Sequence, residues 1–311
     1  GCTAIEHGIY SFEEPVIENG TIHPWKKQMG FDARRLKAEP LWMNFLKAGK
    51  RVATLHFPLT APVDPYTKSG QFGADFSENL TIIESFSQRL APEFVRKDEQ
   101  ADKTFRVSLS DKTKLELPVR APLKSEPMIF PEKNAGLIRM RFSSDQPSEP
   151  DYYFGTSIHR IFCNQEEVAK NYLKAIGPFM AGGAAYSYWQ GKLGTQIFKG
   201  GDGRAEKRLL ETFELLAEHF YQAIKFVLEK INPDVGFYYF HEIDLALHLW
   251  MGILEPECPA SSPELRELLL PIVRRAFESA DRMVGLLLSA VEGEDLLVVV
   301  SDHGMAPIES T

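Results

Sequence analysis

Three stretches of the chain repeat apolar residues at the spacing of an α-helix. In residues 206–231 apolar side chains recur every three or four positions, which predicts a long amphipathic helix with one buried face. Residues 263–290 show the same period, and Ser262 followed by Pro263 is typical of a helix start. A shorter helix is predicted over 39–48. Each apolar face needs a partner surface, so we expect the chain to fold around a layered core.

Three other segments are short, continuously apolar runs, which predict buried strands. They are RVATLHF at 51–57, VGFYYF at 235–240 and LLVVV at 296–300. Runs of this kind are typical of parallel sheets covered by helices, because neither face of such a strand meets water. LLVVV in particular is predicted to be a central strand. Helices that alternate with parallel strands indicate an α/β fold.

The middle of the chain has a different pattern, in which β-branched and aromatic segments alternate with charged or proline-containing turns. LTIIESF, TFRVSLS, KLELPVRA, GLIRMRFSS and YYFGTSIHRIF predict an antiparallel meander between about residues 70 and 164. We therefore predict an αβα sandwich with a mostly parallel central sheet and a β-rich insertion. Its expected parts are an N-terminal part of the core (1–69), the insertion or cap (70–164) and a C-terminal part of the core (165–311).

Composition narrows the class of protein without identifying it. The chain has 311 residues, of which 44% are hydrophobic and 25% charged, and this balance is ordinary for a globular protein. Its formal net charge of −8 argues against a nucleic-acid-binding module, since such modules need a basic surface. No run of about 18 apolar residues occurs, so no membrane span is predicted.

The three cysteines, Cys2, Cys163 and Cys258, are widely spaced and form no CxxC pair. A zinc ribbon and a dense disulfide scaffold are therefore not supported, and Cys163 and Cys258 have no histidine or acid partner at a spacing recognisable for a nucleophile. Sparse cysteines favour a reducing, cytoplasmic compartment. The sequence leaves the location otherwise open, because the chain begins at Gly1 without a targeting segment and reads as a fragment cut at both ends.

Side chains with metal-ligand chemistry follow two of the predicted strands. Asp244 and His248 come after VGFYYF at a spacing that places both on one face of a helix, and Asp302 and His303 directly follow LLVVV. Carboxylate oxygen with imidazole nitrogen suits Zn²⁺ or Mn²⁺, and two such pairs at neighbouring strand ends would form a two-metal centre for phosphoryl transfer. A surface ion pair and an aspartate-capped turn are the alternatives at these two places.

With these motifs in this order, the sequence resembles the alkaline phosphatase superfamily, and within it the type I phosphodiesterase and nucleotide pyrophosphatase group. SDHGM (301–305) after an apolar run and FYYFHEIDLALHLW (237–250) upstream of it resemble the superfamily. GCTAIEHGIYSF (1–12) is similar to the group's TG…HGI segment. EPLWMNFLKAGKRVATLHFPLTAP (39–62) is similar to a bacterial and archaeal subgroup described as predicted phosphohydrolases or phosphomutases.

The resemblance implies a metal-dependent hydrolase of phosphate mono- or diesters that acts on a small phosphoester through a covalent phospho-enzyme. Two divalent ions, Zn or Mn, would be held, one by Asp244 and His248 and the other by Asp302 and His303. It further implies a Thr or Ser nucleophile upstream of Gly1 and a final histidine downstream of SDHGM. The chain is accordingly expected to be a fragment that is inactive, or nearly so, by itself.

The sequence leaves two other functions open. A catalytically silent member of the superfamily would use the fold as a binding or structural scaffold, and a phosphomutase would differ only in the hydroxyl that accepts the phosphoryl group. The segment KGGDGRAEKR (199–208) also places glycines before a helix start, with Arg204 and Lys207 nearby. That pattern is compatible with an anion site, but a flexible turn before a solvated helix face is the simpler interpretation.

Overall fold

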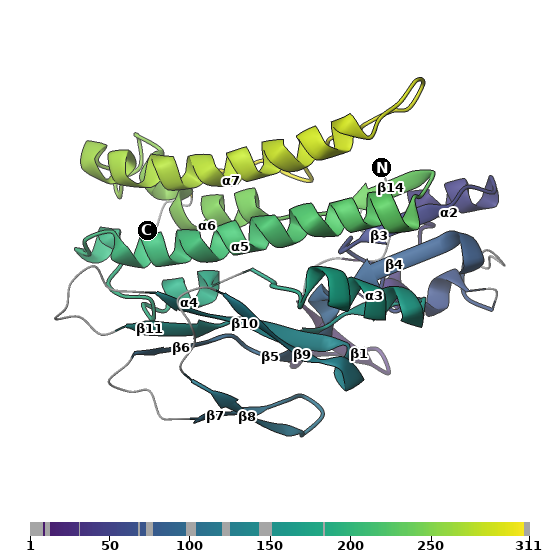
Figure 1. Cartoon of the computed structure of the whole chain (residues 1–311), viewed down its shortest axis with the longest axis horizontal. Helices are drawn as coiled ribbons and strands as arrows, with labels where there is room; N and C mark the ends of the chain where they lie inside the picture. The colour runs from purple at the N-terminus through teal and green to yellow at the C-terminus, as the bar shows by residue number, and fades with distance from the viewer. Residues whose placement is uncertain are drawn as a thin grey trace. The chain divides into compact units, whose positions relative to one another are not determined.

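The computed structural model describes residues 9, 13–30, 32–67, 69–72, 77–97, 104–119, 125–142, 151–182 and 184–307. Its elements are shown in chain order in Figure 1. The chain divides into two compact units, each assembled from three segments of the sequence. The first contains Gly1–Gln88, Ile161–Asn171 and Val227–Tyr239, and the second contains Arg89–Arg160, Tyr172–Phe226 and Phe240–Thr311.

A four-stranded mixed sheet forms the centre of the first unit. Its strands lie in the order β13 (Phe162–Cys163), β4 (Leu80–Glu84), β3 (Val52–Leu55) and β14 (Val235–Tyr238). β14, β3 and β4 are parallel to one another, whereas β13 runs antiparallel to β4. Every residue of β3 and β4 is buried, which explains the nearly continuous apolar character of both segments.

Helix α2 (Leu41–Lys47) packs its apolar side into the core of this first unit. The ring of Trp42 lies 5.8 Å from the rings of Phe57, Tyr66 and Phe237, edge-on to each. Such aromatic pairs contribute about 0.5–1.5 kcal/mol each beyond their burial. The unit also contains the antiparallel hairpin of β1 (Glu13–Glu18) and β2 (Thr21–Met29). Short 3₁₀ turns lie at Ala33–Arg35, Asp64–Tyr66, Ser77–Asn79 and Phe86–Gln88, and a π turn lies at Val227–Ile231.

The second unit is built on a six-stranded antiparallel sheet. Its strands lie in the order β5 (Arg89–Ala91), β12 (Ile158–Arg160), β10 (Ala135–Phe142), β11 (Tyr152–Gly155) and β6 (Phe94–Lys97), and β9 (Glu126–Phe130) pairs with β10. The hairpin of β7 (Thr104–Ser108) and β8 (Lys114–Pro118) packs on one face. There Val107 and Leu117 share a core with Leu137 and Ile158 of the sheet.

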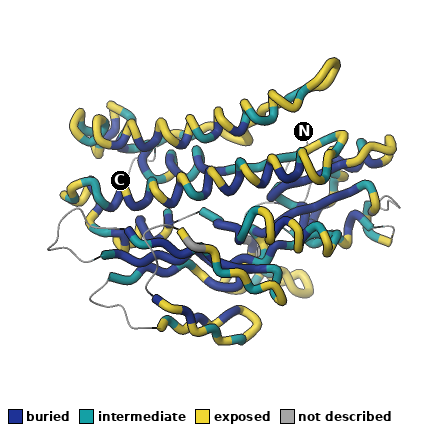
Figure 2. Tube along the Cα trace, in the orientation of Figure 1, coloured by how far each residue is buried: buried dark blue, intermediate teal, exposed yellow. Residues whose placement is uncertain are grey.

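Helices cover the opposite face of this sheet, as Figure 1 shows. They are α4 (Ala185–Trp189), α5 (Arg204–Phe226) and α6 (Glu242–Leu254), and α7 (Pro263–Ser289) packs on α5 and α6 on the side away from the sheet. Phe142 and Phe154 of the sheet join Leu209, Phe213 and Trp250 of the helices in one core. Buried and exposed residues alternate along α5 in Figure 2, as expected of an amphipathic helix. Helix α3 (Glu166–Ile176) begins in the first unit and ends in the second.

The predicted α/β class is confirmed, and so are the helices predicted over 39–48, 206–231 and 263–290 and the strands predicted at 51–57 and 235–240. The Ser262 side chain accepts from the amide of Leu265, as the predicted helix start requires. None of the helices in the described ranges combines the length and apolar character that crossing a bilayer demands. The division of the chain at 69/70 and 164/165 stays a prediction.

Two predictions about strands are wrong. LTIIE, which is β4, is parallel to β3 rather than part of the antiparallel meander. Residues 296–300 form no strand, and Leu296 and Val300 are 84% and 82% exposed. An apolar, β-branched run favours extended backbone, but a strand also needs a hydrogen-bonded neighbour, which 296–300 does not have among the described residues.

Candidate functional site

Helix α6 presents two of the four predicted ligands on one side. The helix buries Ala246, Trp250 and Ile253 along its opposite side, so Asp244 and His248 lie one turn apart toward solvent. Nε2 of His248 is 3.3 Å from Oδ1 of Asp244, and the two side chains are 59% and 38% exposed. Helical geometry therefore brings this pair together as the sequence predicts.

The loop that follows residues 296–300 contains Asp302 and His303 and places the His303 ring near Asp244. Nε2 of His303 is 3.8 Å from Oδ1 of Asp244 and 3.8 Å from Oδ1 of Asp302. Nδ1 of His303 is 2.7 Å from the carbonyl oxygen of Gly304. A carbonyl oxygen only accepts hydrogen bonds, so Nδ1 carries the hydrogen and the neutral ring keeps its lone pair on Nε2. This tautomer is the one that metal-binding histidines adopt through a backbone carbonyl.

The charges around His303 favour its protonated form. The hydrogen bond to the Gly304 carbonyl raises the pKa of His303, and the carboxylates of Asp302 and Asp244 act in the same direction. A divalent ion binds neutral imidazole, so protons would compete with metal at this residue. Metal affinity at the cluster is therefore expected to increase with pH.

Asp244 lies at the centre of this cluster. Its Oδ1 is shielded from solvent and accepts no hydrogen bond from the described residues, although two imidazole nitrogens lie 3.3 and 3.8 Å away. Ligands about 2.1 Å from a tetrahedral ion lie about 3.4 Å from each other, so these spacings are close to those of a metal site. Within the described residues no group of three or more His, Cys, Asp or Glu side chains is already arranged to hold an ion. The donor set fits a divalent ion, and the present arrangement is a cluster of ion pairs.

This arrangement differs from the predicted pair of half-sites at neighbouring strand ends. Asp302 and His303 lie in an exposed loop, because the segment before them forms no strand. His248 and His303 both lie near Oδ1 of Asp244, so the two predicted pairs are neighbours in the structure.

A second acidic residue of α6, Glu242, is a feature that the sequence interpretation missed. It is 1% exposed, and no described side chain donates a hydrogen bond to either carboxylate oxygen. Burial raises the pKa of Glu242 to about 7, against the opposing effect of the amides of Glu242 and His241 at the helix start. The signal in the sequence is its place in HEIDLALH, immediately before two candidate ligands.

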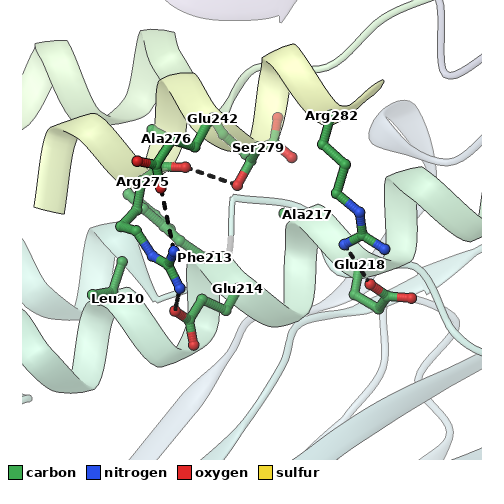
Figure 3. Close-up of a pocket in the computed structure, with 11 residues that line it drawn as sticks. Leu210, Phe213, Glu214, Ala217, Glu218, Glu242, Arg275, Ala276, Ser279 and Arg282 are labelled. Atoms are coloured by element: carbon green, nitrogen blue, oxygen red, sulfur yellow. Dashed lines mark hydrogen bonds and ion pairs between the residues drawn. The ribbon is translucent and has the colours of Figure 1, made fainter. Parts of the chain in front are cut away.

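Glu242 lines a cavity of about 360 Å³ between α5, α6 and α7 of the second unit. Figure 3 shows Arg275 and Arg282 extending from α7 toward acidic residues of α5. Arg275 donates to Glu214 at 3.2 Å, and Arg282 donates to Glu218 at 2.8 Å. The two arginines of the cavity are therefore paired with glutamates other than Glu242.

Two histidines outside the cluster, His56 and His159, have the setting of structural residues. His56 and His159 are 0% and 2% exposed, so they are core residues. Burial raises the pKa of Cys163 to about 11, which keeps its thiol protonated at neutral pH. Cys258 is buried. Cys2 and, except for Ile9, the HGI-like segment 1–12 lie outside the described residues.

A comparison with protein-family models covers the whole chain, including the residues of the site. A family model described as type I phosphodiesterase / nucleotide pyrophosphatase matches residues 1–311. The chain belongs to this family. A search of curated proteins and a search of solved structures gave no match. The type I phosphodiesterase / nucleotide pyrophosphatase family is part of the alkaline phosphatase superfamily, so the resemblance seen in SDHGM and HEIDLALH is confirmed. Membership of the family supports a hydrolase of the phosphodiesterase or pyrophosphatase type.

Proposed function

We propose that the chain is a divalent-metal-dependent hydrolase of phosphate mono- or diesters, acting on a small phosphoester. The observation that supports this best is the convergence of His248 and His303 on Oδ1 of Asp244, at 3.3 and 3.8 Å, with Asp302 beside them. Two carboxylates and two imidazoles form a donor set that suits Zn²⁺ or Mn²⁺. The family match adds the class of reaction, hydrolysis of the phosphodiesterase or pyrophosphatase type, for which a metal site would be used.

The proposal assigns one ion to Asp244 and His248 and a second to Asp302 and His303. When bound, the ions supply positive charge that stabilises the oxygens of a phosphoryl group during its transfer. The Gly304 carbonyl holds the His303 ring with Nε2 directed at the cluster, and the two carboxylates keep the site negative. A route through a covalent phospho-enzyme belongs to the same proposal, with its nucleophile unassigned among the described residues.

A second candidate is a catalytically silent scaffold. It is favoured by the fact that the ligand side chains of the described residues stand in ion pairs rather than in a preformed metal-binding group. A phosphomutase differs from the hydrolase only in the hydroxyl that accepts the phosphoryl group. Metal binding separates the scaffold from the other two, and product analysis with an added alcohol acceptor separates hydrolase from mutase.

The test is metal content measured by elemental mass spectrometry after the chain has been incubated with Zn²⁺ or Mn²⁺ and desalted. Asp244→Asn removes the carboxylate at the centre of the cluster and should weaken binding at least tenfold, since even indirect ligand partners are worth about 10–100-fold. The double variant Asp302→Asn with His303→Gln removes both proposed ligands of the second ion. Asp281→Asn is the matched control, because Asp281 is an exposed aspartate of α7 in the same unit.

Metal bound by the parent and the Asp281→Asn chain, but reduced in the ligand variants, would support the proposal. It would justify a hydrolysis screen with p-nitrophenyl and bis-(p-nitrophenyl) phosphate. A parent chain that retains no metal, or an Asp244→Asn chain that retains as much as the control, would contradict it and favour the scaffold.

A further inference from the structure

A cavity of about 410 Å³ lies in the second unit between β6, β11 and the glycine-rich loop that precedes α5. Lys97, Tyr152, Arg204 and Arg208 line it, together with residues of the loop 194–202. It shares no lining residue with the cluster around Asp244. Three of its side chains are cationic, whereas Asp202 is the one carboxylate among its lining residues.

Arg208 is buried, and within the described part of the chain no carboxylate forms an ion pair with its guanidinium group. The residue is 6% exposed, and its guanidinium carbon lies 3.9 Å from the centre of the Tyr152 ring. Its Nη1 donates to the carbonyl of Leu193 at 2.6 Å. Both contacts hold the guanidinium in place, but neither neutralises it. Burial of an uncompensated charge is unfavourable, so a counter-ion at this position would stabilise the folded chain.

Two carboxyl groups that precede Arg208 in the sequence already have partners. Asp202 accepts from Nε of Arg204 at 2.7 Å, and this contact lowers the pKa of Asp202 to about 2. Glu206 is turned away, because its Oε1 accepts from the Tyr188 hydroxyl at 2.5 Å and from the Ile197 amide at 2.9 Å. Asp202, the carboxylate among the lining residues of the cavity, is therefore paired with Arg204 rather than with Lys97 or Arg208.

Lys97 is the second of these cations. Its ammonium nitrogen lies 5.6 Å from the centre of the Tyr152 ring, the same ring on which Arg208 packs. Lys97 and Tyr152 are opposite each other in the pairing of β6 with β11, so the sheet fixes their spacing. One aromatic ring thus holds two positive charges at the wall of the cavity.

The glycine-rich loop lets the backbone form the rest of the wall. A Cβ atom at Gly201 would lie 2.0 Å from the carbonyl oxygen of Thr195, so only glycine allows this close packing. Helix α5 begins at Arg204, directly after the loop, and its first amide groups add positive potential to the same space.

We propose that this cavity binds a phosphoryl oxyanion, either inorganic phosphate or the phosphate group of a small molecule, between Lys97 and Arg208. A tetrahedral oxyanion accepts hydrogen bonds from both side chains at once, and guanidinium groups suit it especially well. The cavity has room for a phosphate with a small organic part. The site needs no metal ion, so its test is independent of the test of the proposed metal centre.

The test is isothermal titration of the full 311-residue chain with inorganic phosphate, at constant ionic strength and in the presence of EDTA. EDTA removes any contribution from the metal centre. Lys97→Met and Arg208→Met should each weaken binding about tenfold, as loss of one charged hydrogen bond does. Lys207→Met is the matched control, since it removes an equal charge from the exposed side of the same helix turn. Glycerol 3-phosphate in place of phosphate shows whether an ester or the free ion is preferred.

Saturable phosphate binding that Lys97→Met and Arg208→Met weaken and Lys207→Met leaves unchanged would support the site. Lys97 is half-exposed, so its variant tests the proposal even if Arg208→Met fails to fold, which circular dichroism would reveal. No binding of phosphate or glycerol 3-phosphate in EDTA would overturn the proposal. Equal weakening by all three variants would also overturn it, since that result indicates general electrostatic attraction.

Discussion

Replacing Tyr188 by phenylalanine would remove one oxygen from the interior of the second unit and break two hydrogen bonds. Nε1 of Trp250 donates to the Tyr188 hydroxyl at 3.1 Å, and that hydroxyl donates to Oε1 of Glu206 at 2.5 Å. All three residues are at most 1% exposed, so water does not replace a lost partner. The same oxygen of Glu206 also accepts from the amide of Ile197, which ties the start of α5 to the preceding loop.

The expected cost follows from what each partner would lose. Trp250 has a single N–H donor, and leaving it unsatisfied in the core costs about 2 kcal/mol. Glu206 keeps the Ile197 amide, so the loss of one donor there costs about 1 kcal/mol. The ring of phenylalanine fills the same space otherwise. Tyr188→Phe should therefore lower the free energy of unfolding by about 3 kcal/mol.

Urea unfolding followed by far-ultraviolet circular dichroism measures this free energy by linear extrapolation. The matched control is Tyr186→Phe, which removes the same hydroxyl from a residue of the same helix that is 61% exposed. The control should stay within about 0.5 kcal/mol of the parent. A Tyr188→Phe chain within about 1 kcal/mol of the control would refute the reasoning, because the buried bonds would then contribute no more than exposed ones.

Three further predictions concern His219, Cys163 and Gly201. Burial lowers the pKa of His219 from 6.5 to about 4. In the pH window between these two values, the unfolded chain binds a proton at this histidine that the folded chain does not. Stability should fall by about 3 kcal/mol as the pH drops through it, and His219→Gln should flatten that dependence in urea titrations; an unchanged slope would contradict this. Iodoacetamide should label Cys163 about 100-fold more slowly in the folded chain than in urea, because burial raises its pKa from 9.0 to about 11; equal labelling rates by peptide mass spectrometry would count against it. Gly201→Ala places a Cβ 2.0 Å from the Thr195 carbonyl and should lower the melting temperature, whereas Gly252→Ala, with nothing within 4 Å, should not.

The elements that the sequence predicted correctly are those with a long local signal. Helix α7 has a 3.6-residue period over its length and begins at Ser262 and Pro263, which fix its start independently of any partner. The contact between Asp244 and His248 was predictable for the same reason, because residues four apart on any helix lie on one face. These predictions rest on contacts within one segment.

The errors concern partners that lie far away in the sequence. β4 has an apolar pattern that suits either strand direction, and its pairing with β3 is what makes it parallel. Residues 296–300 have the composition of a central strand but no hydrogen-bonded neighbour among the described residues. Glu242 reads as an ordinary surface charge at the start of a helix, and only its packing in the second unit reveals a buried carboxyl group. Local patterns therefore predict which side chains share a face, but not what covers that face.

The exposed LLVVV segment makes the behaviour of the chain in concentrated solution depend on its ionic surroundings. Residues 296–300 combine apolar character with a high preference for extended backbone, which is the composition of segments that join edge to edge between molecules. Glu292, Glu294, Asp295 and Asp302 flank the run and repel the same segment of a neighbouring molecule. Salt screens this repulsion. The net charge of the whole chain also falls to zero near the isoelectric point of about 5.6, which favours association. Self-association of the chain should therefore begin at this segment, in high salt and mild acid.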